Sequence, residues 1–200
     1  MVAKRRKVIV ITDGDYVAQK VVEAVARHVG GRCISLSAGN PTSLSGPQMA
    51  ELITQAAKDP VLVMFDDNGN FATGPGEQAI AYLLTHPSIE VIGAIAVASN
   101  TKTVEGAKVQ YSITNEGKIL DEAVDKDGYA DKSLENHIYG DTVDVLNKYN
   151  IPNVIGIGDI GKMHGKDNVR YGCPITLKAV EWILERSETN ANQRETAPVQ

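Results

Sequence analysis

Several features that mark specialised protein classes are scarce or missing in this sequence. It has only two cysteines, Cys33 and Cys173, which are too few for a disulfide framework, so a reducing compartment is the expected environment and a single bridge stays open. The net charge of -5 does not indicate a general nucleic-acid binder. No apolar run approaches the ~18 residues needed to cross a bilayer. The chain is therefore expected to be soluble.

The N-terminus lacks an apolar segment of signal-peptide length. The basic cluster Lys4–Lys7 is followed by an apolar run from Val8 to Ile11 only, and an aspartate comes soon after. A signal peptide needs about 7–15 apolar residues at this point. The basic cluster either contacts anionic lipid or simply leads into the first strand, and its small number of charges favours the second interpretation.

Short apolar runs alternate with amphipathic segments along the chain. Lys7–Thr12 is rich in β-branched residues, as in a buried strand, and Asp15–Val29 carries valines at helical spacing. The same criteria predict further strands at Arg32–Leu36, Val61–Phe65, Ile89–Ala98 and Asn153–Ile157, and helices at Pro47–Lys58, 75–85, Tyr139–Tyr149 and Pro174–Arg186.

This order predicts an α/β fold, a single doubly wound Rossmann-like domain with a mostly parallel sheet and one antiparallel edge strand or hairpin. Lys108–Thr114 alternates between apolar and polar residues and is expected to be an edge strand, with a hairpin turn after it. The domain is expected to span residues 1–187. Residues 188–200 are polar and poor in apolar side chains, which predicts a disordered C-terminal tail.

Acidic residues follow the predicted strands at the edge of the sheet where ligands bind in doubly wound folds. Converging carboxylates repel unless a cation or protons neutralise them, and their oxygen atoms suit Ca²⁺ or Mg²⁺. Aspartate is also a preferred N-cap and turn residue, so each acid has a structural alternative. The candidate ligand or cation site, with no metal or cofactor assigned, consists of Asp13, Asp15, Asp66, Asp67, Asp159 and Lys162.

Response-regulator receiver domains carry a similar set of groups, namely paired acids, a phospho-acceptor aspartate, a hydroxyl and a lysine after successive strands. The chain is long for a receiver, and its predicted hairpin has no place in one. The spacing of Asp66, Asp67 and Asn68 also lacks the Asp-x-Asp pair of Toprim-type domains. A Mg²⁺-dependent phospho-acceptor or phosphoryl-transfer domain is therefore the alternative function. The receiver roles would fall, in order, on Asp13, Asp15, Asp66, Ser99 and Lys162.

The loop Gly156–Met163, GIGDIGKM, matches the dinucleotide-binding spelling G-x-G-x-x-G. That fingerprint belongs at the opening of a βαβ unit, whereas here it follows the last predicted strand. It also departs from a P-loop, because Met163 stands where Ser or Thr would bind Mg²⁺. Nucleotide binding is not predicted, and a weak anion-binding nest of backbone amides stays open.

Six segments, in order over nearly the whole chain, resemble the stage V sporulation protein AE family in its soluble AEa form. They are KVIVITDGD (7–15), GGRCISLSAGNPTSLSG (30–46), DPVLVMFDDNGN (59–70), VIGAIAVAS (91–99), IYGDTVDVLNKYNIPNVIGIGDIGKM (138–163) and PITLKAVEWILERS (174–187).

The resemblance implies a non-enzymatic, hydrophilic accessory of the spore apparatus that moves calcium dipicolinate during sporulation and germination. Its expected partners are other stage V sporulation protein A-type membrane proteins, which would carry the permeation path. The expected location is the spore, peripheral at the inner membrane. The resemblance supplies no catalytic residues. That the acidic edge engages a calcium chelate is a hypothesis drawn from the residues.

Overall fold

The computed structural model describes residues 4–68, 74–100 and 104–196. Its centre is a seven-stranded sheet with the strand order β2-β3-β1-β4-β9-β6-β7. Only the pairing of β6 with β7 is antiparallel, and the other neighbours in this sheet run parallel. The predicted Rossmann-like α/β fold is confirmed. The strands are β1 (Arg6–Ile11), β2 (Arg32–Cys33), β3 (Val61–Met64), β4 (Ile89–Val97), β6 (Tyr111–Ile113), β7 (Ile119–Leu120) and β9 (Val154–Ile157).

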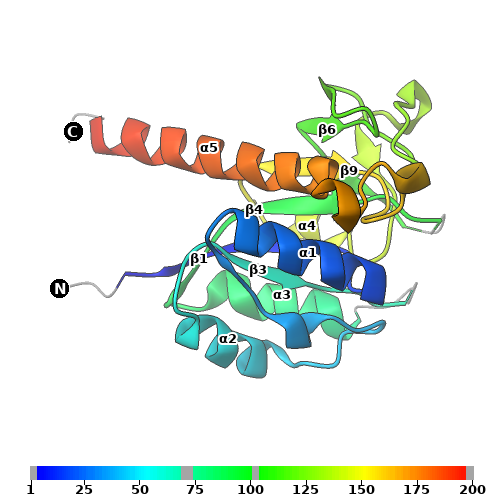
Figure 1. Ribbon diagram of the computed structural model, residues 1–200. Helices are drawn as coiled ribbons and strands as arrows, with labels where there is room; N and C mark the ends of the chain where they lie inside the picture. Colours follow the sequence, from blue (N-terminus) through cyan, green and yellow to red (C-terminus); the bar gives the residue numbers. More distant parts are fainter. Residues whose placement is uncertain (1–3, 69–73, 101–103, 197–200) are drawn as a thin grey trace.

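Helices cover both faces of the sheet (Figure 1). In β1, Val8 and Val10 belong to one buried core and Ile9 and Ile11 to the other, because successive side chains of a strand point to opposite faces. Helices α2 (Gly46–Gln55), α3 (Pro75–Thr85) and α4 (Val145–Lys148) contribute to the first core, and α1 (Tyr16–His28) and α5 (Pro174–Thr196) to the second. A doubly wound sheet with two apolar cores results.

The segment predicted as one edge strand, Lys108–Thr114, is divided between two sheets. Its start belongs to β5 (Ala107–Lys108), which pairs with β8 (His137–Ile138) in a separate antiparallel ribbon. Its second half is β6, which lies inside the main sheet between β9 and β7. Ser112 and Ile113 are buried there. The edge prediction for this segment is therefore wrong, and β7 forms the antiparallel edge.

The helix predicted over Tyr139–Tyr149 is also shorter than expected, with α4 spanning only Val145–Lys148. Gly140 lies so close to β4 that an added Cβ would be 2.1 Å from the Val97 carbonyl oxygen. The Asp144 carboxylate accepts hydrogen bonds from the backbone N–H groups of Glu105, at 3.2 Å, and Gly106, at 2.9 Å. These contacts fix the chain before α4 in a non-helical path. The second predicted strand is similarly short, and a 3₁₀ turn at Ser35–Ser37 follows it.

Helix α5 runs to Thr196, ten residues beyond the predicted end at Arg186. Residues 188–193 are exposed and mostly polar, and they include residues of good intrinsic helix propensity such as Glu188 and Ala191. The helix thus includes residues 188–196 of the expected C-terminal tail, and residues 197–200 lie outside the described part of the chain. Among the helices described, none is long and apolar enough to cross a membrane.

Candidate functional site

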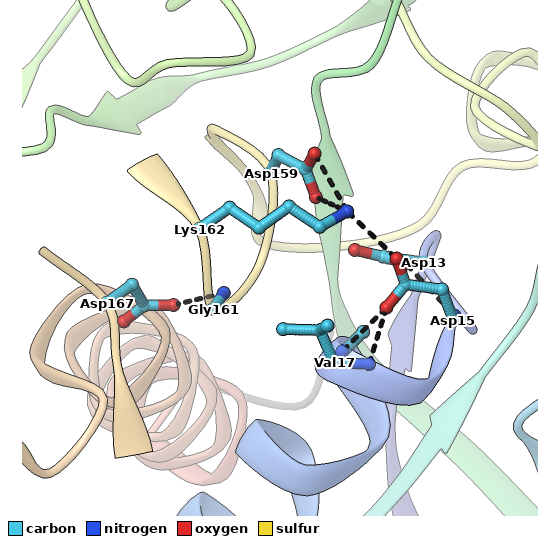
Figure 2. A network of polar contacts seen from close by, with 8 residues as sticks. Asp13, Asp15, Val17, Asp159, Gly161, Lys162 and Asp167 are labelled. Carbon is cyan, nitrogen blue, oxygen red and sulfur yellow. Dashed lines mark hydrogen bonds and ion pairs between the residues drawn. The ribbon is translucent and has the colours of Figure 1, made fainter. Parts of the chain in front are cut away.

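The residues that follow β1 and β9 meet at the carboxyl edge of the sheet (Figure 2). Lys162 Nζ lies 2.8 Å from Asp15 Oδ2 and 2.9 Å from Asp159 Oδ1. Asp13 lies beside this ion pair. The structure thus brings four of the six predicted site residues together. We call Asp13, Asp15, Asp159 and Lys162 the edge cluster.

Asp15 in the edge cluster is also the N-cap of α1. Its Oδ1 accepts hydrogen bonds of 2.8 Å from the backbone N–H groups of Val17 and Ala18, which α1 cannot satisfy internally. Burial acts to raise the pKa of Asp15, but the hydrogen bonds from Lys162 and Ala18 outweigh it, so the pKa is lowered. Asp15 therefore stays ionised, and its two oxygen atoms are already used by the protein.

Asp13 is the carboxyl group with spare binding capacity. Its side chain is buried, Oδ1 accepts a 3.3 Å hydrogen bond from the Asp15 N–H, and the buried Oδ2 has no partner within the described residues. Burial, aided by the neighbouring charge of Asp15, raises the pKa of Asp13 to about 7. Asp13 consequently is the carboxyl group of the cluster that gains or loses a proton near neutral pH.

Asp159 and Lys162 complete the edge cluster. Burial raises the pKa of Asp159 even though the Lys162 ammonium opposes this shift. Burial lowers the pKa of Lys162, yet its hydrogen bonds to Asp15 and Asp159 dominate and the pKa is raised. The lysine therefore remains a fixed cation at physiological pH. The backbone N–H of Asp159 also donates a 2.8 Å hydrogen bond to the Lys126 carbonyl, which anchors the loop after β9.

The other two predicted residues, Asp66 and Asp67, lie on the loop after β3. Asp67 caps α3 from a distance, because its Oδ1 accepts a 2.6 Å hydrogen bond from the Gly76 N–H and its Oδ2 a 3.1 Å bond from the Glu77 N–H. Asp66 Oδ1 accepts a 2.9 Å bond from the Asn68 N–H. Burial raises the pKa of Asp66. In the described part of the chain, neither residue has a hydrogen bond or ion pair with Lys162.

The two acidic loops nevertheless touch through Gly14. A Cβ added to Gly14 would lie 2.9 Å from the Gly39 carbonyl oxygen and 3.2 Å from the Asp66 Cβ. Glycine is needed here because any side chain would separate the loops. The close approach keeps Asp66 next to the edge cluster, although the two sets of carboxylates have different hydrogen-bond partners.

The expected Ca²⁺ or Mg²⁺ site can be compared with these contacts. Over residues 4–68, 74–100 and 104–196, no group of three or more His, Cys, Asp or Glu side chains is placed to hold a metal ion. The oxygen atoms of Asp15 and Asp67 accept backbone hydrogen bonds instead. For these two residues, the helix-capping alternative describes the observed geometry.

Asp167 is an important residue that the sequence did not single out. It is fully buried, its Oδ1 accepts hydrogen bonds from the N–H groups of Ile175 and Thr176, and its Oδ2 accepts a 2.6 Å bond from the Thr176 hydroxyl. The Gly161 N–H donates to the same Oδ2 at 3.2 Å. That amide of the predicted anion nest is therefore already satisfied. Pro174, a helix-start residue, is the only local signal that pointed to this cap.

Neither cysteine has the environment of a nucleophile. Both are free thiols, and burial raises the pKa of Cys33 to about 12 and that of Cys173 to about 11. The reactive form of cysteine is the thiolate, which is scarce at neutral pH when the pKa is this high. The open question of a single bridge is also resolved, because Cys33 and Cys173 do not form a disulfide.

The sequence model described as stage V sporulation protein AE1 matches residues 7–187 of the chain. The chain belongs to this family. Membership in the stage V sporulation protein AE1 family gives the protein a role in sporulation and fits a location in the spore. The matched range contains the whole edge cluster together with Asp66, Asp67 and Asp167. No curated protein and no solved structure matches the chain.

Proposed function

We propose that this protein is a non-enzymatic accessory component of the spore machinery that moves calcium dipicolinate during sporulation and germination. The observation that carries the proposal is the family match over residues 7–187, which runs from β1 into α5. Its partners are other stage V sporulation protein A-type membrane proteins. The protein acts at the inner membrane of the spore as a peripheral component.

The contacts of the edge cluster support a binding or structural role over catalysis. The raised pKa of Lys162 keeps its ammonium protonated, so this lysine cannot serve as a general base. Asp15 and Asp67 are held as helix caps. Asp13 alone in the cluster has a buried oxygen without a partner, and a lone carboxyl group does not provide the paired acid and base of a hydrolase.

Deletion of the gene in its spore-forming host tests the physiological role. We expect spores with less dipicolinate, slower dipicolinate release during germination, or both, and restoration of these properties by the wild-type gene. The measurements are dipicolinate content per spore and the time course of its release. Normal content together with normal release kinetics would overturn the proposal.

A thermal-shift experiment tests whether the protein contacts the cargo itself. The purified protein is heated with Ca²⁺, with dipicolinate, and with both together. A ligand that binds only the folded state raises the melting temperature. A shift seen only with the calcium chelate supports a ligand role, and Asp13→Asn, which removes the unpartnered carboxylate, should reduce it. The absence of a shift in all three conditions favours an adaptor that binds only proteins.

The alternative function is a Mg²⁺-dependent phospho-acceptor domain. The grouping of Asp13, Asp15 and Lys162 favours it. Two observations weigh against it. Lys162 binds Asp15 and Asp159, and β3 lies between β2 and β1, whereas flavodoxin-like receivers have the order 2-1-3-4-5.

Incubation with Mg²⁺ and acetyl phosphate separates the two functions. We expect no phosphorylation of the wild-type protein, measured by intact-protein mass spectrometry. A mass increase that is abolished by Asp66→Asn would establish the phospho-acceptor and exclude the non-enzymatic reading. Asp121→Asn, at an exposed aspartate outside both acidic loops, is the matched control.

A further inference from the structure

A groove of about 760 Å³ lies beside the amino ends of β6 and β9. Its volume is in the range of ordinary small-molecule sites. Val154, the first residue of β9, lines the groove, whereas Asp159 of the edge cluster follows the other end of the same strand. Tyr111, at the start of β6, is paired with Ile155 and lines the groove as well. The groove is therefore separate from the edge cluster.

The charge in this groove is positive, although the whole chain has a net charge of -5. Its lining includes Lys108, Lys148 and Arg186 but no aspartate or glutamate. Lys148 is paired with Glu77, at 3.3 Å. Among the residues that the structure describes, no carboxylate forms an ion pair with Lys108 or with Arg186. Within the described residues, two cations of the groove therefore have no carboxylate partner.

Arg186 is held in place by aromatic rings. Its guanidinium carbon lies 5.1 Å from the centre of the Tyr111 ring and 4.6 Å from that of Trp182, which is itself buried. The two rings contact each other edge to face, with their centres 5.7 Å apart. Stacking restrains a guanidinium and leaves its N–H edge available for a bidentate contact with an oxyanion.

Lys108 is positioned through its backbone. Its N–H donates a 2.9 Å hydrogen bond to the Asn147 side-chain oxygen, and the Asn147 side-chain nitrogen donates a 2.7 Å bond to the Gly106 carbonyl. These bonds fix β5 against α4. Asn136 and Asn150 add further amide groups to the lining. The groove therefore offers one guanidinium held against aromatic rings, one lysine on an anchored backbone, and neutral hydrogen-bonding groups.

We propose that this groove binds a phosphate monoester group, carried by a small molecule or by a phospholipid headgroup. Such a group has a charge of about -1.5 to -2 at neutral pH and three acceptor oxygens. Its charge matches that of Lys108 and Arg186 together, whereas a single carboxylate would leave one of them unneutralised. Arg186 supplies the forked contact, Lys108 the second charge, and the amides complete the oxygen shell.

Binding of glycerol phosphate to the full-length protein, followed by isothermal titration calorimetry, tests the small-molecule source. Cosedimentation with phosphatidylcholine vesicles, with and without phosphatidic acid, tests the headgroup source. We expect saturable binding in at least one arm, weakened by salt. Arg186→Gln and Lys108→Gln should each lower the binding affinity about tenfold. Arg186→Lys should lose less affinity than Arg186→Gln.

Two matched controls remove a positive charge outside the groove, Arg170→Gln in an exposed turn and Lys4→Gln near the N-terminus. Both should bind like the wild type, and circular dichroism verifies that every variant is folded. The proposal is overturned if neither arm shows binding, if Arg186→Gln and Lys108→Gln bind normally, or if the controls lose as much affinity. Equal affinity for succinate would overturn the assignment to phosphate.

Discussion

Lys162 Nζ lies 2.8 Å from Asp15 Oδ2, a contact between residues 147 positions apart in the chain. The same ammonium contacts Asp159, so a single lysine links the start of α1 to the loop after β9. A lysine that bridges two carboxylates near a third, Asp13, keeps negative charge from accumulating at this edge of the sheet. The edge cluster is therefore an element of stability as well as a candidate site.

Replacement of Lys162 by methionine should destabilise the protein at neutral pH. Asp15 and Asp159 would then repel each other without a counter-ion. Since the lysine side chain is 44% exposed, solvent screens the pairs and the loss should be only about 1 kcal/mol, or a few degrees in melting temperature. Differential scanning calorimetry at pH 7 and at progressively lower pH measures it, and the difference from wild type should shrink only as the pH falls below 3.8 and through the lowered pKa of Asp15, where this carboxylate becomes protonated.

The matched control is Lys58→Met, at an exposed lysine far from the edge cluster in the sequence. It should leave the melting temperature unchanged within a degree or so, as expected for an isolated surface charge. Equal destabilisation by the two substitutions, or a Lys162→Met effect that does not depend on pH, would show that the bridge contributes nothing.

The raised pKa of Asp13 predicts a definite pH dependence of stability. Between the ordinary pKa of 3.8 and the folded-state pKa of about 7, folded Asp13 holds a proton that the unfolded chain has released. The free energy of unfolding therefore falls as pH rises through this window, and the loss is complete above it. Asp13→Asn cannot ionise, so it should be more stable than wild type at pH 8, by ~1–4 kcal/mol.

Urea denaturation of both proteins at pH 4 and pH 8 measures this difference. The two curves should nearly coincide at pH 4, because Asp13 is then largely protonated in the folded state. Asp15→Asn should change the free energy of unfolding at pH 8 in the opposite direction. It weakens the cap of α1 and the bond to Lys162, so this variant should be less stable than wild type. Asp13→Asn that is less stable than wild type at pH 8 would contradict the prediction.

Asp167 is expected to be the most sensitive carboxylate in the protein. Replacement by alanine removes four hydrogen bonds, three to the first turn of α5 and one to Gly161. Buried backbone donors without partners are costly, so the free energy of unfolding should fall by about 2–4 kcal/mol. Chemical denaturation measures it. Asp167→Asn keeps one acceptor oxygen and should lose less stability than Asp167→Ala. Equal losses of stability in the two variants would argue against the capping role.

Asp67→Ala should remove the cap of α3. The N–H groups of Gly76 and Glu77 would lose their acceptor, at a cost of ~1–2 kcal/mol. Hydrogen exchange should show faster exchange confined to the first turn of α3, in contrast to the surface control Asp121→Ala. A role of Asp67 in ligand binding alone would leave exchange in α3 unchanged.

The sequence contained enough information to predict the strands of the main sheet, but not all of the connections between them. Buried strands such as β1, β3 and β4 are continuous apolar runs, and such runs are visible without any tertiary context. The path around β5 and α4 was mispredicted, because it depends on distant contacts such as Gly140 against Val97 and Asp144 against Gly106. The local sequence pattern contains no information about those long-range contacts. Helix α5 was underestimated because its final turns have no apolar face to mark them.

For the candidate site, the parallel strands were enough to predict that the acidic residues lie at one edge of the sheet. They were not enough to predict which acidic residues pair with Lys162. Strand β1 lies between β3 and β4, and β9 is on the far side of β4. Lys162 therefore reaches Asp15 and not Asp66. Strand order is set by the whole topology, and spacing along the chain cannot reveal it. The long-range caps from Asp67 and Asp167 were hidden for the same reason, since they act across nine residues.

The bridge from Lys162 to Asp15 also bears on how the chain is completed at the ribosome. Strands β1, β2, β3 and β4 are all synthesised before residue 100, and they are neighbours in the sheet. Domains tend to fold from the N-terminal part as it emerges. Asp15 must then wait for its counter-ion, because Lys162 is made 147 residues later. A premature stop before Lys162 would leave Asp15 permanently without this ion pair.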